Sequence, residues 1–172
     1  VIAASCLPLL AGRRLLAAAA LTAALAALLL IPPGAVKDRP GLLHEEESRY
    51  QFIQVVRSGE SRRLYLNEGY AVHSEWRPGT PLTGGEWDMF LAAPPLLGRE
   101  PRRAATLGNA AGTTARSFGL YYPGASIDGV ELDPAVTAVG RRWFGLDDNP
   151  RLTVHTADAR PFLRQTEARY DL

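Results

Sequence analysis

The chain has 172 residues, of which 47% are hydrophobic and 22% charged, and its formal net charge at pH 7 is +1. This balance gives no support for nucleic-acid binding, which needs an excess of basic residues. Cys6 is the only cysteine, which excludes an intramolecular disulfide and a thiolate metal cluster. The three histidines are scattered along the chain, so we expect no metal site.

Residues 1–35 are predicted to form one or two membrane segments. Residues 15–31 carry Thr22 as their only polar side chain, and their length is at the short end of what crosses a hydrocarbon core. Two arginines precede this stretch, and residues 1–10 are also mostly apolar. A secretory signal peptide is the alternative. We therefore expect a cell membrane as the location, with lipid as a partner. Basic residues flank both ends, so the positive-inside rule leaves the side undetermined.

Residues 36–44 are predicted to be a linker, and residues 45–80 a small β region. Residues 50–56 and 62–66 both alternate apolar with polar side chains, and Ser58-Gly59 separates them. Alternating runs joined through a glycine turn predict a β-hairpin.

Residues 81–172 are predicted to form an incomplete nucleotide-binding domain of Rossmann type. The apolar run 104–107 is typical of a buried parallel strand. Gly108 and Gly112 bound a loop of small residues, which lets a ligand approach the backbone closely. A helix is expected from residue 113, and its free N–H groups favour a negative or polar ligand group.

Glu131 lies near the end of the second predicted strand, residues 126–132. It follows Gly108 by about the twenty residues that such folds use for ribose recognition, and a carboxylate accepts hydrogen bonds from both ribose hydroxyls. A tight connection without a ligand is the alternative, because the loop lacks the full G-x-G-x-x-G pattern. Asp133 and Pro134 then predict the cap and first residue of a helix that runs through Phe144.

Asp158 follows the third predicted strand, residues 151–155, and is placed to accept a hydrogen bond from an adenine amino group. Its alternative role is the N-cap of a helix that begins at Ala159. Residues 170–172 predict the start of a fourth strand.

These motifs occur in the order found in spermidine synthases: residues 47–53 (ESRYQFI), 64–67 (LYLN), 107–108 (LG), 129–134 (GVELDP), 158–160 (DAR) and 170–171 (YD). The chain most resembles the membrane-fused spermidine-synthase-like proteins of bacteria, over about residues 45–172. The resemblance implies an α/β protein: a membrane helix, a small β-sheet, and a methyltransferase-like Rossmann domain. It also implies the bacterial plasma membrane as the location.

The resemblance implies a transferase that moves an aminopropyl group from decarboxylated S-adenosylmethionine to a polyamine such as putrescine, without a metal. By position, Gln51 would contact the cofactor, Glu131 the ribose and Asp158 the adenine. The family's catalytic base is an acidic residue shortly after the YD strand, so it is expected beyond Leu172. The family commonly forms homodimers, and a homodimer is expected here.

Two departures from the family pattern bear on the substrates. Glu86, Trp87 and Asp88 replace the family's acidic pair and Tyr-His; they are predicted to attract a polyamine and cover its methylene chain. Their alternative is a solvated first helical turn. Ala111 stands where the family usually has an aspartate near the cofactor's charged tail, so the preference for decarboxylated cofactor is open. An S-adenosylmethionine-dependent methyltransferase and a non-catalytic nucleoside- or polyamine-binding module are therefore alternative functions.

Overall fold

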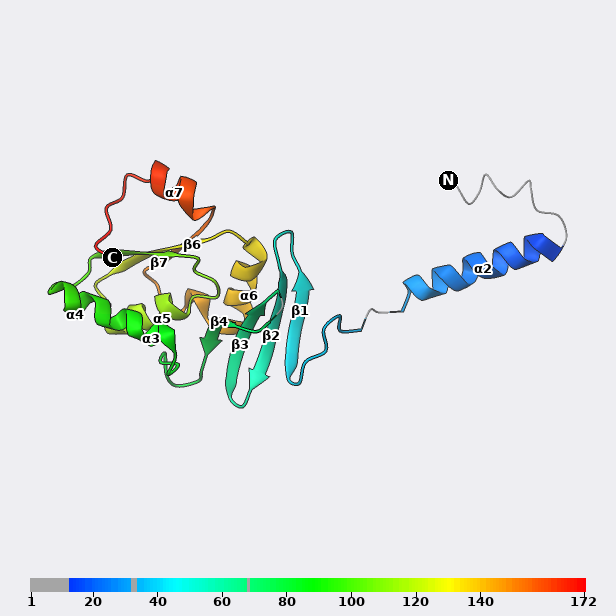
Figure 1. The fold of residues 1–172 in the computed structure, drawn as a ribbon, viewed down its shortest axis with the longest axis horizontal. Coiled ribbons are helices and arrows are strands. Elements are labelled where there is room, and N and C mark those ends of the chain that lie inside the picture. The colour runs from blue at the N-terminus through cyan, green and yellow to red at the C-terminus, as the bar shows by residue number, and fades with distance from the viewer. Residues whose placement is uncertain (1–12, 32–33, 68) are drawn as a thin grey trace. The chain divides into compact units, whose positions relative to one another are not determined.

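The computed structural model describes residues 13–31, 34–67 and 69–172 (Figure 1). The chain divides into two compact units, Val1–Lys37 and Asp38–Leu172. The first unit holds helix α2 (Arg13–Leu29), in which Leu16, Leu21 and Leu25 are exposed. Within the described residues, no helix is long and apolar enough to cross a membrane.

The membrane helix expected over residues 15–31 is therefore not confirmed. Helix α2 has 17 residues. The second expected segment, residues 1–10, lies outside the described residues.

The second unit begins with an antiparallel sheet in the order β1-β2-β3-β4 (Figure 1). Its strands are β1 (Leu42–Glu47), β2 (Phe52–Ser58), β3 (Ser61–Leu66) and β4 (Val72–Trp76). The predicted hairpin is confirmed as β2 and β3, which pair from Ile53↔Leu66 to Ser58↔Ser61. Strand β1 starts inside the predicted linker, so the predicted boundary is wrong. Three consecutive glutamates in this strand break the alternation of apolar and polar residues by which a strand is recognised in a sequence.

The remaining elements alternate between helices and the strands of a parallel sheet, β5-β6-β7. In chain order they are α3 (Glu86–Met89), η2 (Phe90–Ala92), α4 (Ala93–Leu97), β5 (Arg103–Leu107), α5 (Thr113–Tyr121), β6 (Ser126–Glu131), α6 (Pro134–Phe144), η3 (Leu146–Asp148), β7 (Leu152–Thr156) and α7 (Ala159–Gln165). The three parallel strands and the helices between them confirm the predicted Rossmann pattern.

The expected fourth strand does not form a regular strand, although the end of the chain lies beside β5. The Asp171 N–H donates to the Arg103 carbonyl at 2.8 Å, and the Ala105 N–H donates to the Leu172 carbonyl at 3.0 Å. These backbone bonds place residues 171–172 at the free edge of β5.

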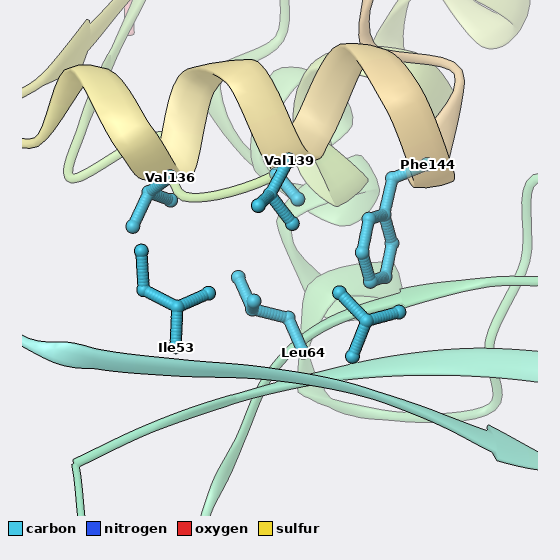
Figure 2. Close-up of a cluster of buried hydrophobic side chains, with 7 residues drawn as sticks. Ile53, Leu64, Val136, Val139 and Phe144 are labelled. Atoms are coloured by element: carbon cyan, nitrogen blue, oxygen red, sulfur yellow. The ribbon is translucent and has the colours of Figure 1, made fainter. Parts of the chain in front are cut away.

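One hydrophobic cluster joins the two sheets. Ile53 and Leu64 of the antiparallel sheet point toward Val136, Val139 and Phe144 of α6 (Figure 2). Because α6 follows β6, this packing fixes the antiparallel sheet to the parallel one. A second cluster packs α5 on the parallel sheet through Ala115, Phe118 and Ile127.

Candidate functional site

The loop after β5 is held against the end of β6. The N–H groups of Gly108 and Asn109 both donate to the Val130 carbonyl, at 2.9 and 3.0 Å. Gly108 and Gly112 have φ angles of +80° and +81°, a region that favours glycine. A Cβ at Gly112 would also collide with Leu146. Both predicted glycines therefore shape the loop, whether or not a ligand is bound.

Glu131 ties this loop to the start of α6. Its side chain is 8% exposed; Oε2 accepts the Ala110 N–H at 2.8 Å, and Oε1 accepts the Asp133 N–H at 3.0 Å. An ionised carboxylate has about four acceptor positions, so each oxygen keeps capacity for a further donor. The ribose role stays a prediction, and the loop-holding role is one that the sequence did not reveal.

Ala111 and Asn109 both turn inward. Ala111 is fully buried in the core cluster, and its N–H donates to Ser74 Oγ at 3.0 Å. An aspartate here would bury a charge among apolar side chains, which is costly. Asn109 lies against Gly129, and among the described residues its amide atoms have no hydrogen-bond partner. The mid-strand glycine was the available signal for this close packing.

A cavity of about 540 Å³ lies beyond the carboxyl ends of β6 and β7. Its lining includes Ser48, Tyr50, Leu132, Asp133, Thr156 and Asp158. The volume falls within the range of about 300–1,000 Å³ of small-molecule sites. Leu132, which directly follows Glu131, is 43% exposed and supplies an apolar surface. The sequence analysis did not single out Leu132, although its place at the end of a predicted strand was a signal.

Asp158 is the N-cap of α7, as predicted. Its Oδ1 accepts the Arg160 N–H at 2.9 Å, and Oδ2 accepts from the Arg160 guanidinium at 2.7 Å. The side-chain and backbone hydrogen bonds from Arg160 lower the pKa of Asp158 to about 2. Asp158 is thus an ionised acceptor at neutral pH at the wall of the cavity. Its contact with adenine stays a prediction.

The turn between β1 and β2 reaches the same cavity. Ser48 Oγ donates to Asp133 Oδ2 at 2.5 Å, while Asp133 Oδ1 caps α6 by accepting the Ala135 N–H at 2.9 Å. Gln51 closes the turn, because its N–H donates to Ser48 Oγ at 3.0 Å. Gln51 is half-buried, and its contact with the cofactor stays a prediction. No local signal could reveal the Ser48–Asp133 bond, which joins residues 85 positions apart.

The three residues predicted to bind the amine do not share the cavity of Asp158. Asp88 accepts the N–H groups of Thr83 and Gly84, at 3.1 and 2.7 Å, so its carboxylate serves its own loop. Glu86 and Trp87 line another cavity, of about 490 Å³. The Asp88 contacts favour the alternative of a helix-initiating turn, and the amine role stays a prediction.

Asp128, in the middle of β6, is a buried carboxylate away from both cavities. It accepts hydrogen bonds from Arg103 at 2.8 Å and Tyr170 at 3.1 Å, and pairs with His155 at 2.7 Å. Burial alone would raise the pKa of Asp128, but these partners hold it below its usual value. Within the described part of the chain, no group of three His, Cys, Asp or Glu residues could hold a metal ion.

Several curated proteins are similar to about three quarters of this chain, whereas no model of a known protein family matches it. A probable polyamine aminopropyl transferase of Bifidobacterium longum is 34% identical over 131 residues, which cover 76% of this chain and 29% of the relative. A polyamine aminopropyltransferase of Corynebacterium efficiens is 35% identical over 133 residues, covering 73% and 24%. The chain thus spans less than a third of the length of either relative.

A shorter stretch of the chain is similar to part of a methyltransferase. The eEF1A lysine and N-terminal methyltransferase of Mus musculus is 32% identical over 74 residues, covering 43% of this chain and 11% of the relative.

Solved structures share the fold of the second unit. A probable spermidine synthase from Corynebacterium glutamicum has a TM-score of 0.59 and 22% identity, covering 75% of this chain and 48% of that one. A spermidine synthase in complex with the transition-state analogue AdoDATO has a TM-score of 0.58 and 19% identity, covering 76% and 45%.

The second unit therefore has the fold of these spermidine synthase structures, with a cavity at the carboxyl ends of β6 and β7. Over about three quarters of its length, the chain is thus similar to part of two polyamine aminopropyltransferases, and it shares a fold with part of two spermidine synthases.

Proposed function

We propose that the second unit binds the adenosine part of decarboxylated S-adenosylmethionine, in an enzyme that transfers its aminopropyl group to an amine. The observation that carries this is the cavity beyond β6 and β7, which is lined by exposed Leu132 and ionised Asp158. Glu131 directly precedes Leu132 in the chain and is not among the residues that line the cavity. The similarity to polyamine aminopropyltransferases supports this chemical class, and a polyamine such as putrescine is the first acceptor to test.

Each residue has a defined part in this proposal. Glu131 accepts the ribose hydroxyls with its remaining lone pairs, Leu132 packs against the adenine, and Asp158 accepts from the adenine amino group. Because a sulfonium is already an activated leaving group, positioning of donor and acceptor supplies most of the catalysis. Gln51 is proposed to border the cofactor from the β1–β2 turn.

The proton of the attacking ammonium needs a separate base, since an ammonium has no lone pair. Asp171 is a poor candidate, because its Oδ2 already accepts the N–H groups of Arg102 and Arg103 at 2.8 and 3.0 Å. The base is therefore proposed to be another acidic residue of the complete site.

Methyl transfer from S-adenosylmethionine is the second candidate function. Ala111 is buried in the core, so this position offers no carboxylate to the amino group of a decarboxylated cofactor. The partial resemblance to a methyltransferase also favours methyl transfer. Competition between the two nucleotides for the chain separates the candidates.

The experiment is a calorimetric titration with decarboxylated S-adenosylmethionine, S-adenosylmethionine and methylthioadenosine, followed by an assay for methylthioadenosine release with putrescine. Aminopropyl transfer predicts stronger binding of the decarboxylated nucleotide, and release of methylthioadenosine by the complete enzyme. Stronger binding of the carboxylated nucleotide supports methyl transfer. Binding of either nucleotide without turnover by the complete enzyme supports a non-catalytic binding module.

Location at the bacterial plasma membrane and a homodimer are further proposals. The exposed leucines of α2 support the membrane location. The homodimer is proposed because spermidine synthases, which the chain resembles, commonly form dimers. Pelleting with membranes, with and without residues 13–31, tests the membrane location. Analytical sedimentation of residues 38–172 tests the homodimer.

A further inference from the structure

The cavity of about 490 Å³ lies between the antiparallel sheet and the start of α3. Arg63, Glu75 and Arg77 line it from β3, β4 and the residue after β4, and Glu86 and Trp87 line it from α3. Charged groups of both signs thus face one small volume.

Two arginines hold one buried carboxylate in this cavity. Arg63 Nε donates to Glu75 Oε2 at 3.0 Å, and Arg77 Nε donates to Glu75 Oε1 at 2.6 Å. The Glu75 side chain is 6% exposed, whereas those of Arg63 and Arg77 are 33% and 40% exposed. Two cations against one anion leave a positive charge, and the Arg77 fork has four N–H donors besides the one at Nε.

Glu75 is therefore not a site for an ammonium group. Burial alone would raise the pKa of Glu75, but the hydrogen bonds from Arg77 and Arg63 keep it below its usual value, so the carboxylate stays ionised. Both of its oxygens already accept from guanidinium groups. An incoming ammonium would meet two like charges before it reached this carboxylate.

Glu86 is the one acidic side chain of the predicted amine-binding trio whose carboxylate is not turned toward its own loop. Asp88 points to the N–H groups of Thr83 and Gly84, while Glu86 is exposed at the cavity lining. The half-buried Trp87 lies beside it and offers an apolar surface. The guanidinium groups of Arg63 and Arg77 thus line the cavity from the sheet side, and the Glu86 carboxylate lines it from α3.

The cavity also adjoins the loop that is predicted to meet the cofactor. Ser74 Oγ accepts the Ala111 N–H at 3.0 Å, and the Glu75 N–H donates to Thr113 Oγ1 at 3.0 Å. Strand β4 is therefore bonded both to the loop and to the first turn of α5. A ligand in this cavity would therefore contact a strand that is bonded to the loop after β5.

We infer that this cavity binds an amine that also carries a carboxylate, an amino-acid-like acceptor, with Arg77 pairing the carboxylate and Glu86 pairing the ammonium. The inference rests on the proposed function and changes its acceptor from a diamine to an amino-carboxylate. A diamine would place its second ammonium against the arginine pair, which is unfavourable.

The test compares 4-aminobutyrate with putrescine, which share a four-carbon chain and differ only at one terminal group. Calorimetry on the full chain is expected to show 4-aminobutyrate binding about tenfold more tightly or better, a difference of about 1.4 kcal/mol. Arg77→Gln is expected to remove this preference, and Arg77→Lys to keep part of it. Arg141→Gln, at an exposed arginine of α6 outside the cavity, is the control and is expected to change nothing.

Equal or tighter binding of putrescine overturns the inference, as does undiminished 4-aminobutyrate binding by a folded Arg77→Gln variant. Methylthioadenosine titrated into the same samples separates the two proposals. If it binds while putrescine is preferred, the nucleotide proposal stands and the acceptor inference fails. If it does not bind while 4-aminobutyrate binds through Arg77, the nucleotide proposal fails and the assignment of the cavity stands.

Discussion

The Glu131 carboxylate accepts two backbone N–H groups, so its replacement is expected to lower stability as well as ligand binding. In Glu131→Gln, one amide N–H₂ faces a backbone N–H of Ala110 or Asp133, so a hydrogen bond is lost. The expected cost is about 1–3 kcal/mol in the free energy of unfolding, with at least about tenfold weaker methylthioadenosine binding. Urea denaturation and calorimetry measure the two effects. Glu47→Gln, at the exposed end of β1, is the matched control.

An unchanged affinity of folded Glu131→Gln would remove the ribose assignment. A loss of stability alone would leave Glu131 a purely structural residue.

Leu132 allows binding to be separated from stability, because its side chain is largely exposed. Leu132→Ala is expected to weaken methylthioadenosine binding about tenfold while moving the urea midpoint little. Leu163→Ala is a close match, since Leu163 is 45% exposed against 43% for Leu132, and lies outside the cavity lining. Calorimetry that finds equal losses in both variants would rule out Leu132 as the adenine surface.

The lowered pKa of Glu75 determines how the free energy of unfolding is expected to change at acid pH. Its pKa is lowered in the folded state from an ordinary 4.5, so its stabilising effect is complete above that value and is lost as the pH falls below it. The urea midpoint should therefore be level between pH 7 and about pH 5 and decline below about pH 4.5. Glu75→Gln should decline less steeply over the acid range. Parallel declines in both proteins would show that the arginine pairing does not shift this group.

At the scale of elements, local signals predicted the βαβ unit well. The apolar run of β5, the small-residue loop, Glu131 at the end of β6, and Asp133-Pro134 at the start of α6 all appear as expected. Strand β1 was missed because it is stabilised by pairing with β2 and not by an alternating sequence. The bonds from Ser48 and Ser74 to distant residues depend on tertiary packing, which no local pattern contains.

The hydrogen bond between Ser48 in the β1–β2 turn and Asp133 at the start of α6 can be tested by mutation. Asp133→Ala removes both the α6 cap and the acceptor for Ser48, and is expected to cost about 1–3 kcal/mol of unfolding free energy. Ser48→Ala should cost about 0.5–1.5 kcal/mol. A double-mutant cycle by urea denaturation should show a coupling between the two sites. Strictly additive losses would mean that the bond contributes nothing.

For the second unit as a whole, α6 links the two sheets, so they should unfold together. Phe144→Ala empties part of the shared core (Figure 2) and is expected to cost about 3–5 kcal/mol. Hydrogen exchange should show amides of β2 and β6 losing protection together. Loss of protection in the antiparallel sheet alone would contradict a single cooperative unit. Leu97→Ala, at an exposed leucine of α4, is the control.

The most direct test of the nucleotide site is an NMR titration of the chain with methylthioadenosine. We expect saturable one-to-one binding, with amide shifts concentrated at residues 131–135 and 156–160, around the cavity beyond β6 and β7. Absence of binding at about 1 mM nucleotide by the folded chain, or shifts confined to residues outside this cavity, would contradict it.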